Sequence, residues 1–578
     1  MNKVALLLLL CLLTVCAALS QDTTRIMPGL IMRYGEDLGS LERSYPLSWS
    51  AHHRDRIRRF LLEWKNTLAE MGTGEFSVED QVDYRLFENL LEYELEQRGI
   101  EQERREELVP LLPFAADITM LDETRRNMEK ADPQSAADLL NRLNDGIAAV
   151  RRGVEAGIKK EGKEDVTPIR ATPVQANRAV MECRQLGRVL DHWYHYYAGY
   201  DPLFTWWVAA PYQTLSRSLK SYADFLMEQV VGVGADDKDT IIGDPIGRDA
   251  LLAALKFEMI SYTPEELIRI AEMEYDWCER NMKEASRELG FGDDWLQAVE
   301  YVKTLYVPPG DQPELIRNLA LEAIDFVEER DLVTVPPLAR ESWRMEMMSA
   351  ERQKVSPFFL GGEVIMVAFP LDSMQHEQKM MSLRGNNIHF ARATVHHELI
   401  PGHHLQGFMM DRFNQYRHVF WTPFWVEGWA LYWEMRLWDL RFPKTAEDRV
   451  GMLFWRMHRC ARIIFSLSFH LGTMTPQECI DMLVERVGHE RDNATAEVRR
   501  SFGGSYPPLY QVAYMIGTLQ FRALYEELVV GGRMTDKQFH DRILEGNVMP
   551  VEAVRWRLSG GEVPAGKPDW RFYPGLEK

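Results

Sequence analysis

The sequence predicts a mainly α-helical protein with one short interruption, and two observations support this fold class. Apolar residues recur at three- and four-residue steps through most of the chain from about residue 50, which is the period of a helix with one buried face. The stretches Thr263-Pro264-Glu265-Glu266 and Thr475-Pro476-Gln477-Glu478 each carry the cap, proline and acid of a helix start. One region, residues 361–370, breaks the helical pattern.

Four helices are expected in the first half of the chain, over residues 57–68, 83–97, 136–154 and 177–197. Pro-Pro pairs at residues 308–309 and 336–337 favour bends. We therefore divide the chain into an N-terminal helical portion, residues 21–340, and a C-terminal portion, residues 341–578, within one continuous two-lobed domain.

The segment from Gly361 to Pro370 predicts a short strand, because β-branched and apolar residues lie between two glycines and a proline. An exposed edge strand can pair with an extended peptide backbone. A purely structural strand is the alternative interpretation.

Composition excludes some classes of partner. The 578 residues are 46% hydrophobic and 27% charged, with a net charge of −20, which fits a globular protein and argues against nucleic acid or an anionic membrane surface as a ligand. The charge favours solubility, with a preference for neutral or basic ligands as the alternative. The sequence does not indicate an oligomeric state.

The N-terminus, residues 1–20, is typical of a secretory signal peptide. A lysine at position 3 precedes an apolar run that ends at Ala18-Leu19-Ser20, so cleavage is expected after Ser20. We expect export, to the periplasm or the medium. The alternatives are an N-terminal membrane anchor and a lipoprotein modified at Cys16, although Val15 is a poor residue before a lipidated cysteine. No later stretch is apolar enough to span a bilayer.

The cysteines that remain after cleavage do not form a disulfide framework. They are scattered through helical sequence without a C-x-x-C pair. We interpret them as isolated buried thiols, with a Cys460–Cys479 bridge as the alternative. These cysteines are Cys183, Cys278, Cys460 and Cys479.

The segment from Val395 to Gln406 contains four histidines and one glutamate within nine residues. A zinc hydrolase commonly takes two imidazoles from His-Glu-x-x-His on one helix face. Here Pro401 stands where the second histidine is expected. His397 and His403 are six positions apart and would lie about 9 Å apart along a regular helix, too far to share one ion.

The Pro401-Gly402 pair between the two histidines favours a break in the helix. Proline lacks the N–H that would bond to the carbonyl of His397, and glycine accepts most backbone conformations. A helix break here would bring His403 back to His397, with His404 as the alternative ligand. Glu398 would then stand beside Zn²⁺ as the base for a zinc-bound water.

A third ligand is expected from the apolar helical run between Phe424 and Glu434. A carboxylate in such aromatic surroundings is costly unless it is paired or metal-bound. We choose Glu427 as the third metal ligand. Glu434 lies on the same helix face and either orients a ligand imidazole or forms a structural salt bridge.

Three motifs together resemble a known family. They are H-E-x-x-P-G-H-H at residues 397–404, E-G-W-A-x-Y at residues 427–432 and P-x-x-x-x-x-Y-x-x-G at residues 508–517. The chain resembles the bacterial "domain of unknown function 885" family over most of its mature length, and this family looks like a branch of the gluzincin zinc metallopeptidases. The resemblance implies a large helical body with a deep cleft, like neurolysin or angiotensin-converting enzyme, and a small β-sheet near the zinc site.

The resemblance also implies roles for further residues. Tyr514 would be the phenol that stabilises an oxyanion. His470 would contact the substrate or the transition state, although Ser466 stands near the position where the family has an acid. Glu497 and Arg500 match a family E-x-x-R motif, and we expect an ion pair between them in preference to a site for a substrate carboxylate.

The resulting hypothesis is an exported zinc metallopeptidase that hydrolyses short or unfolded peptides. His397, His403 and Glu427 would hold zinc, and Glu398 would activate the attacking water. The alternatives are a zinc amidase acting on a cell-wall or small amide substrate, and a non-catalytic surface binding protein. An intact Glu398 argues against the latter, because a purely structural site needs no base.

Overall fold

The computed structural model describes residues 25–577, except 160–165, 235–236, 238–239, 354–358, 505, 562, 565 and 567. The described chain is mainly helical and contains one two-stranded sheet, so the predicted fold class is confirmed at this level. The expected signal peptide, residues 1–20, lies outside the described residues.

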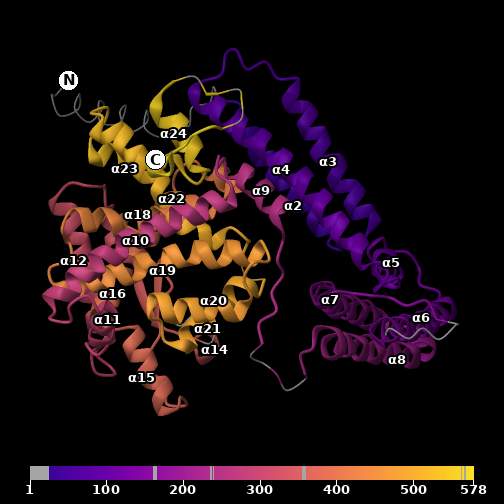
Figure 1. Cartoon of the computed structure of the whole chain (residues 1–578). Helices are drawn as coiled ribbons and strands as arrows, with labels where there is room; N and C mark the ends of the chain where they lie inside the picture. The colour runs from indigo at the N-terminus through magenta and orange to yellow at the C-terminus, as the bar shows by residue number, and fades with distance from the viewer. Residues whose placement is uncertain are drawn as a thin grey trace.

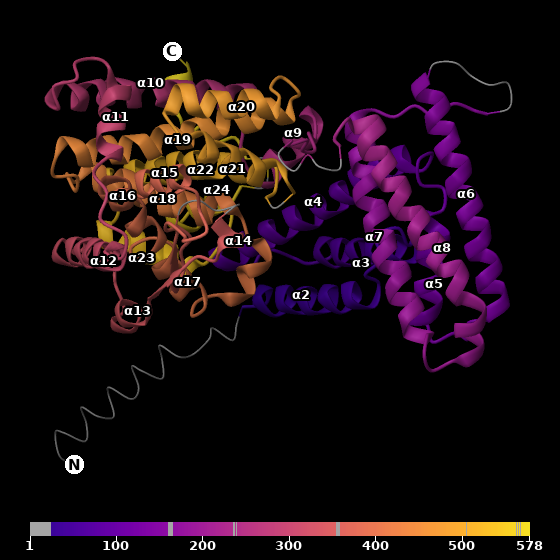
Figure 2. The ribbon, with the colours of Figure 1, turned by 90° about the horizontal axis from the view of Figure 1, so that it is seen from below.

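Three helices at the beginning of the chain connect the main body to a smaller bundle (Figures 1 and 2). The longest, α4, has 31 residues and is therefore about 46 Å long. Its first half buries Leu86 and Leu90 in the core of the body, and Leu108 at its end belongs to the core of the bundle. The helices are α2 (Met27–Ser44), α3 (Ala51–Ala69) and α4 (Val78–Leu108).

The smaller bundle stands apart from the body in both views and has its own core (Figures 1 and 2). Trp193, Phe204 and Tyr222 are among its fully buried side chains. Its elements are α5 (Ala115–Arg126), α6 (Pro133–Lys159), α7 (Pro173–Tyr197), α8 (Pro202–Leu226) and the wide turn η1 (Met227–Val231). The helices predicted over residues 136–154 and 177–197 are thus confirmed as α6 and α7.

The rest of the described chain forms the main body, in which α10 packs along α19 and α18 along α22. Its first helices are α9 (Arg248–Phe257), α10 (Pro264–Glu288), α11 (Trp295–Lys303), α12 (Gln312–Glu329) and α13 (Pro337–Ser342). Residues of α9 to α11 share a core with residues 390–572, so the packing does not follow a division at residue 340.

The remaining elements of the body include those that carry the histidine and glutamate motifs of the sequence. They are α14 (Ala350–Gln353), α15 (His376–Gly385), α16 (Ile388–Glu398), α17 (His403–Met410), η2 (Gln415–Phe420), α18 (Pro423–Asp439), α19 (Ala446–His470), α20 (Pro476–Met482), η3 (Leu483–Val487), α21 (Arg491–Phe502), α22 (Tyr510–Tyr525), η4 (Glu526–Val530), α23 (Asp536–Gly546), α24 (Val551–Ser559) and η5 (Pro574–Glu577).

The sheet consists of β1 (Arg344–Met347) and β2 (Val364–Val367), which pair in parallel with Arg344 opposite Val364. Ile365 and Val367 pack against α16 through Val395. On its other edge, β2 is bridged at Met366 by Leu360. The predicted strand therefore exists, but part of the edge that could pair with a peptide is already occupied by the chain itself.

Local sequence signals agree with these boundaries. Complete capping boxes begin α10 at Thr263 and α20 at Thr475, as the sequence predicts. All four described cysteines are buried and free, so the alternative Cys460–Cys479 bridge is not formed. None of the helices in the described part of the chain is both long and apolar enough to cross a bilayer.

Candidate metal centre

The helix break predicted at Pro401-Gly402 is present. Helix α16 ends at Glu398 and α17 begins at His403, with a cis bond between Ile400 and Pro401. The Gly402 N–H donates to the carbonyl of His396 at 3.0 Å. A side chain on residue 402 would collide with the carbonyl of His397, so glycine allows the two helix ends to meet closely.

Helix α18 holds the break in place. The indole N–H of Trp429 donates to the carbonyl oxygen of Pro401 at 2.9 Å. The side-chain amide of Gln406 donates to the carbonyl oxygen of Trp425 at 3.3 Å. The aromatic helix that carries Glu427 therefore also sets the position of α17.

The two histidines and the glutamate predicted as metal ligands converge. Oε2 of Glu427 lies 3.2 Å from Nε2 of His403 and 3.6 Å from Nε2 of His397. One potential ligand atom from each residue lies within 4.8 Å of the other two. His397 and Glu427 are buried and His403 is half-buried.

A second carboxylate, that of Glu434, orients His397 from the Nδ1 side of its ring. Oε1 of Glu434 lies 2.7 Å from Nδ1 of His397, and Nη2 of Arg459 lies 3.4 Å from the same oxygen. Burial alone would lower the pKa of His397, but its contacts with Glu427 and Glu434 raise it to about 9. Glu434 thus favours a proton on Nδ1 and leaves Nε2 facing Glu427.

The other two histidines of the motif face away from this cluster. Nε2 of His404 lies 2.7 Å from the carbonyl oxygen of Ala339. The ring of His396 is buried and nearly perpendicular to that of Phe442, at 5.6 Å between ring centroids. The geometry therefore groups His403, and not His404, with His397.

Glu398 is half-buried against the segment that leads into β2. The N–H of Gly362 donates to its backbone carbonyl at 3.2 Å, and a side chain at Gly361 would collide with its carboxylate. Burial raises the pKa of Glu398, and His397 and His403 act in the opposite direction. The glycine at 361 thus leaves space for the carboxylate beside the metal cluster.

Helices α18 and α22 cross in direct backbone contact, which brings two tyrosines to the cluster. A Cβ on Gly428 would lie 2.7 Å from the Cα of Gly517. Tyr510 donates its phenolic O–H to Oε1 of Glu427 at 2.5 Å. Sequence reasoning missed Tyr510, although it lies one helical turn before Tyr514 and so on the same face.

Tyr514 lies over the imidazole of His397. The centroids of the two rings are 6.2 Å apart, and the interplanar angle is 16°. The guanidinium groups of Arg459 and Arg462 lie 5.2 and 4.4 Å from the Tyr514 ring centroid. Burial and the nearby charge of Glu427 raise the pKa of the Tyr514 phenol, so it stays protonated and can donate a hydrogen bond.

No contact joins His470 to the metal cluster in the described part of the chain. It is the last residue of α19, eight residues beyond Arg462, which corresponds to about 12 Å along the helix. Its carbonyl oxygen accepts from the N–H of Gly247 at 3.0 Å. The contact of His470 with the substrate or the transition state, which the family resemblance implies, stays a prediction.

The expected ion pair between Glu497 and Arg500 is confirmed, with 3.2 Å between Oε2 and Nε. Arg462 also donates to Oε1 of Glu497 at 2.6 Å. These positive neighbours outweigh the effect of burial and lower the pKa of Glu497 to about 2. The motif therefore joins α19 to α21.

The cluster fits a zinc ion by its donor set. Two imidazole nitrogens and one carboxylate oxygen are a usual set for a zinc ion that keeps an open position. Ligands of a tetrahedral ion with bonds of about 2 Å lie roughly 3.3 Å apart. The two distances from Glu427, 3.2 and 3.6 Å, are close to this value, and the ligand atoms of the two histidines lie within 4.8 Å of each other. Glu434 supplies the outer contact that such a histidine needs.

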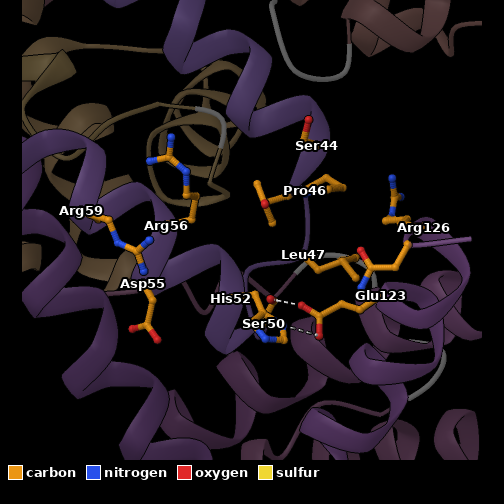
Figure 3. A pocket seen from close by; sticks show the side chains of 12 residues that line it. Ser44, Pro46, Leu47, Ser50, His52, Asp55, Arg56, Arg59, Glu123 and Arg126 are labelled. Carbon is orange, nitrogen blue, oxygen red and sulfur yellow. Dashed lines mark hydrogen bonds and ion pairs between the residues drawn. The ribbon is translucent and has the colours of Figure 1, made fainter. Parts of the chain in front are cut away.

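A hollow of about 320 Å³ lies elsewhere, between the end of α2, the start of α3 and α5. Figure 3 shows Ser50 and His52 on one side, both directed at Glu123 from α5. This carboxylate is already bonded to the cap of α3, and the hollow shares no residue with the metal cluster.

Fold and site together define a class, namely helical proteins with a His-His-Glu cluster at a broken helix. The sequence matches a family described as "Bacterial protein of unknown function (DUF885)" over residues 35–558. The chain therefore belongs to this family, as its motifs suggest. A search of curated proteins finds no match.

Two solved structures are similar to this chain in fold. One is described as a "putative lipoprotein of unknown function" from Shewanella oneidensis, with a TM-score of 0.66, 17% identity and coverage of 92% of this chain and 100% of that one. The other, described as a "putative lipoprotein" from Colwellia psychrerythraea, has a TM-score of 0.58, 15% identity and coverage of 92% and 98%. At these identities the likeness concerns the fold alone.

Proposed function

We propose that this protein is an exported zinc metallopeptidase that hydrolyses short or unfolded peptides. The observation that carries the proposal is the convergence of His397, His403 and Glu427 within 4.8 Å, with Glu398 next to His397 in the chain. A purely structural metal site does not need such a carboxylate.

Each residue of the site would have a separate role in metal binding or catalysis. Nε2 of His397, Nε2 of His403 and Oε2 of Glu427 would hold the ion. When bound, zinc polarises a carbonyl group and lowers the pKa of water. Glu398 would take the proton of the attacking water and pass it to the leaving nitrogen. Tyr514 would donate its phenolic hydrogen to the oxygen that becomes negative.

Two observations support the substrate class and the compartment. The ligand side chains are buried or half-buried, so a thin extended chain reaches them more easily than a folded protein. Export is supported by the sequence of residues 1–20 and by the description of both solved structures as "putative lipoproteins".

The test uses the purified full chain and its Glu398→Gln variant. We expect about one zinc per chain by elemental analysis in both proteins, because Glu398 is not a ligand. Mass spectrometry of a mixed peptide library should show cleavage products with the original protein and none with the variant.

The matched control is Glu377→Gln, which changes an exposed acid on α15 and should leave cleavage unchanged. The proposal is wrong if the zinc-loaded protein cleaves no peptide, or if Glu398→Gln cleaves as well as the original.

A further inference from the structure

A cavity of about 830 Å³ lies where the connecting helices, the smaller bundle and the main body meet. Its walls come from the segment before α3, the second half of α4, the start of α7, the segment before α9 and the end of α21. Apolar side chains such as Trp49, Met181 and Phe502 form part of the surface. The space is large enough for several residues of an extended peptide.

Positive charge predominates in this cavity, whereas the chain as a whole carries −20. Five arginines and three acids line it. The five arginines are Arg98, Arg104, Arg105, Arg178 and Arg499, and the three acids are Glu101, Glu182 and Asp244. Such a local reversal of sign concentrates anionic groups at the cavity.

The three acids already have partners. Oδ1 of Asp244 lies 2.6 Å from Nη2 of Arg178. The carboxylate of Glu182 accepts from the indole N–H of Trp49 at 2.7 Å. Glu101 lies 3.6 Å from Arg98. Their closest contacts are therefore with groups other than Arg104 and Arg105, although the charges of Glu101 and Glu182 still act to raise the pKa of Arg105.

Arg104 and Arg105 make no ion pair with a carboxylate in the described part of the chain. Arg104 reaches the carbonyl oxygen of Ile246 at 3.5 Å, and Arg105 reaches the side-chain oxygen of Gln102 at 3.3 Å. Both are half-buried. Burial, followed by the charge of Arg54, lowers the pKa of Arg105. Like charges gathered in this way are unfavourable until an anion joins them.

The loop after α21 connects the rim of this cavity to the metal cluster. Gly504 lines the cavity and is two residues before Tyr506, whose ring stacks on Tyr510 at 4.2 Å. Tyr510 in turn bonds Glu427. Two residues of chain span at most about 7 Å, so this path brings the rim at Gly504 within on the order of 20 Å of the cluster. An extended peptide of about six residues covers this distance.

We propose that Arg104 and Arg105 form a subsite for a carboxylate of the peptide substrate, several residues from the bond that is cleaved. The proposal rests on the proposed function for its substrate class. The carboxylate comes either from the peptide's C-terminus or from an acidic side chain, because both present the same two oxygens to a guanidinium group.

The experiment measures binding without cleavage, by fluorescence anisotropy on the full-length Glu398→Gln protein. Three labelled hexa-alanine probes are compared: one with a free C-terminal carboxylate, one amidated, and one amidated with glutamate as its last residue. We expect a carboxylate-bearing probe to bind at least tenfold more tightly than the amidated one. A gain with the free acid alone assigns the chain terminus, and a gain with the glutamate probe assigns the side chain.

Adding Arg104→Ala and Arg105→Ala should remove this preference, and the corresponding glutamine pair, which keeps side-chain length, should do the same. The matched control is Arg188→Ala with Arg217→Ala, which removes two exposed arginines outside the cavity and should keep the preference. The proposal is overturned if no probe is preferred, if the preference survives both arginine replacements, or if the control loses it. This experiment measures peptide binding alone, whereas peptidase activity is tested by the cleavage experiment described above. Failure of the subsite proposal and failure of the proposed function are therefore distinguishable.

Discussion

Glu434 and His397 form a pair in which Oε1 lies 2.7 Å from Nδ1, on the side of the ring opposite Glu427. The carboxylate is buried and its pKa is lowered: burial would raise it, but Arg459 and His397 outweigh that effect. It therefore presents a fixed negative charge to the imidazole, which favours the ring orientation that directs Nε2 at the metal position.

Glu434→Gln should weaken zinc binding roughly tenfold or more, the usual cost of losing such an outer carboxylate. The measurement is competition for zinc with a chelator of known affinity. Asp439→Asn, an exposed acid on the same helix, is the control and should bind zinc as the original does. Equal zinc affinity in all three proteins would contradict the orienting role.

Gly517→Ala should destabilise the protein, because the new methyl group would collide with the carbonyl oxygen of Phe424 and force α18 away from α22. Overpacking of this kind costs about 1–3 kcal/mol. Thermal unfolding should show a lower midpoint than in Gly407→Ala, where the added methyl group meets no atom within 4 Å. Equal unfolding midpoints for Gly517→Ala and Gly407→Ala would contradict this explanation.

Tyr514→Phe should lower kcat by on the order of 10²- to 10³-fold if the proposed function is right, the usual cost of removing an oxyanion donor. Zinc content should not change, since the phenol is not among the ligand atoms. The measurement is steady-state cleavage of a peptide identified from the library. Tyr200→Phe, an exposed tyrosine of the smaller bundle, serves as control, and an unchanged kcat in Tyr514→Phe would exclude this role.

The helix break and the grouping of His397, His403 and Glu427 could be predicted because their causes are local. A proline without an N–H followed by glycine interrupts any helix, and a carboxylate in an aromatic helix needs a strong partner. Those two rules require only neighbouring residues in the sequence.

The role of Tyr510 could not be predicted, because it depends on how separate helices cross. Gly428 and Gly517 are 89 positions apart in the chain, and nothing in either segment alone indicates that they touch. For the same reason, a boundary drawn at two proline pairs could not reveal that α9 to α11 share a core with residues 390–572.

Glu258 should make the protein less stable as the pH rises. It is buried beside the start of α18, where Thr422 donates to its carboxylate. Burial raises its pKa to about 8, and the bond from Thr422 only partly opposes this. Between the unfolded pKa of about 4.5 and pH 8, the folded chain keeps a proton that the unfolded chain releases, so the free energy of unfolding falls as the pH increases. At about 1.4 kcal/mol per pKa unit, the loss at pH 8 is on the order of 4 kcal/mol.

Glu258→Gln removes this ionisation and should therefore raise the melting temperature at pH 8 much more than at pH 5. The measurement is thermal unfolding of both proteins at the two pH values, with Glu36→Gln, an exposed acid on α2, as the matched control. An equal gain at both pH values would mean that packing, and not ionisation of Glu258, accounts for the change. No gain at pH 8 would mean that the carboxylate of Glu258 is accommodated in its charged form at the start of the helix that carries Glu427.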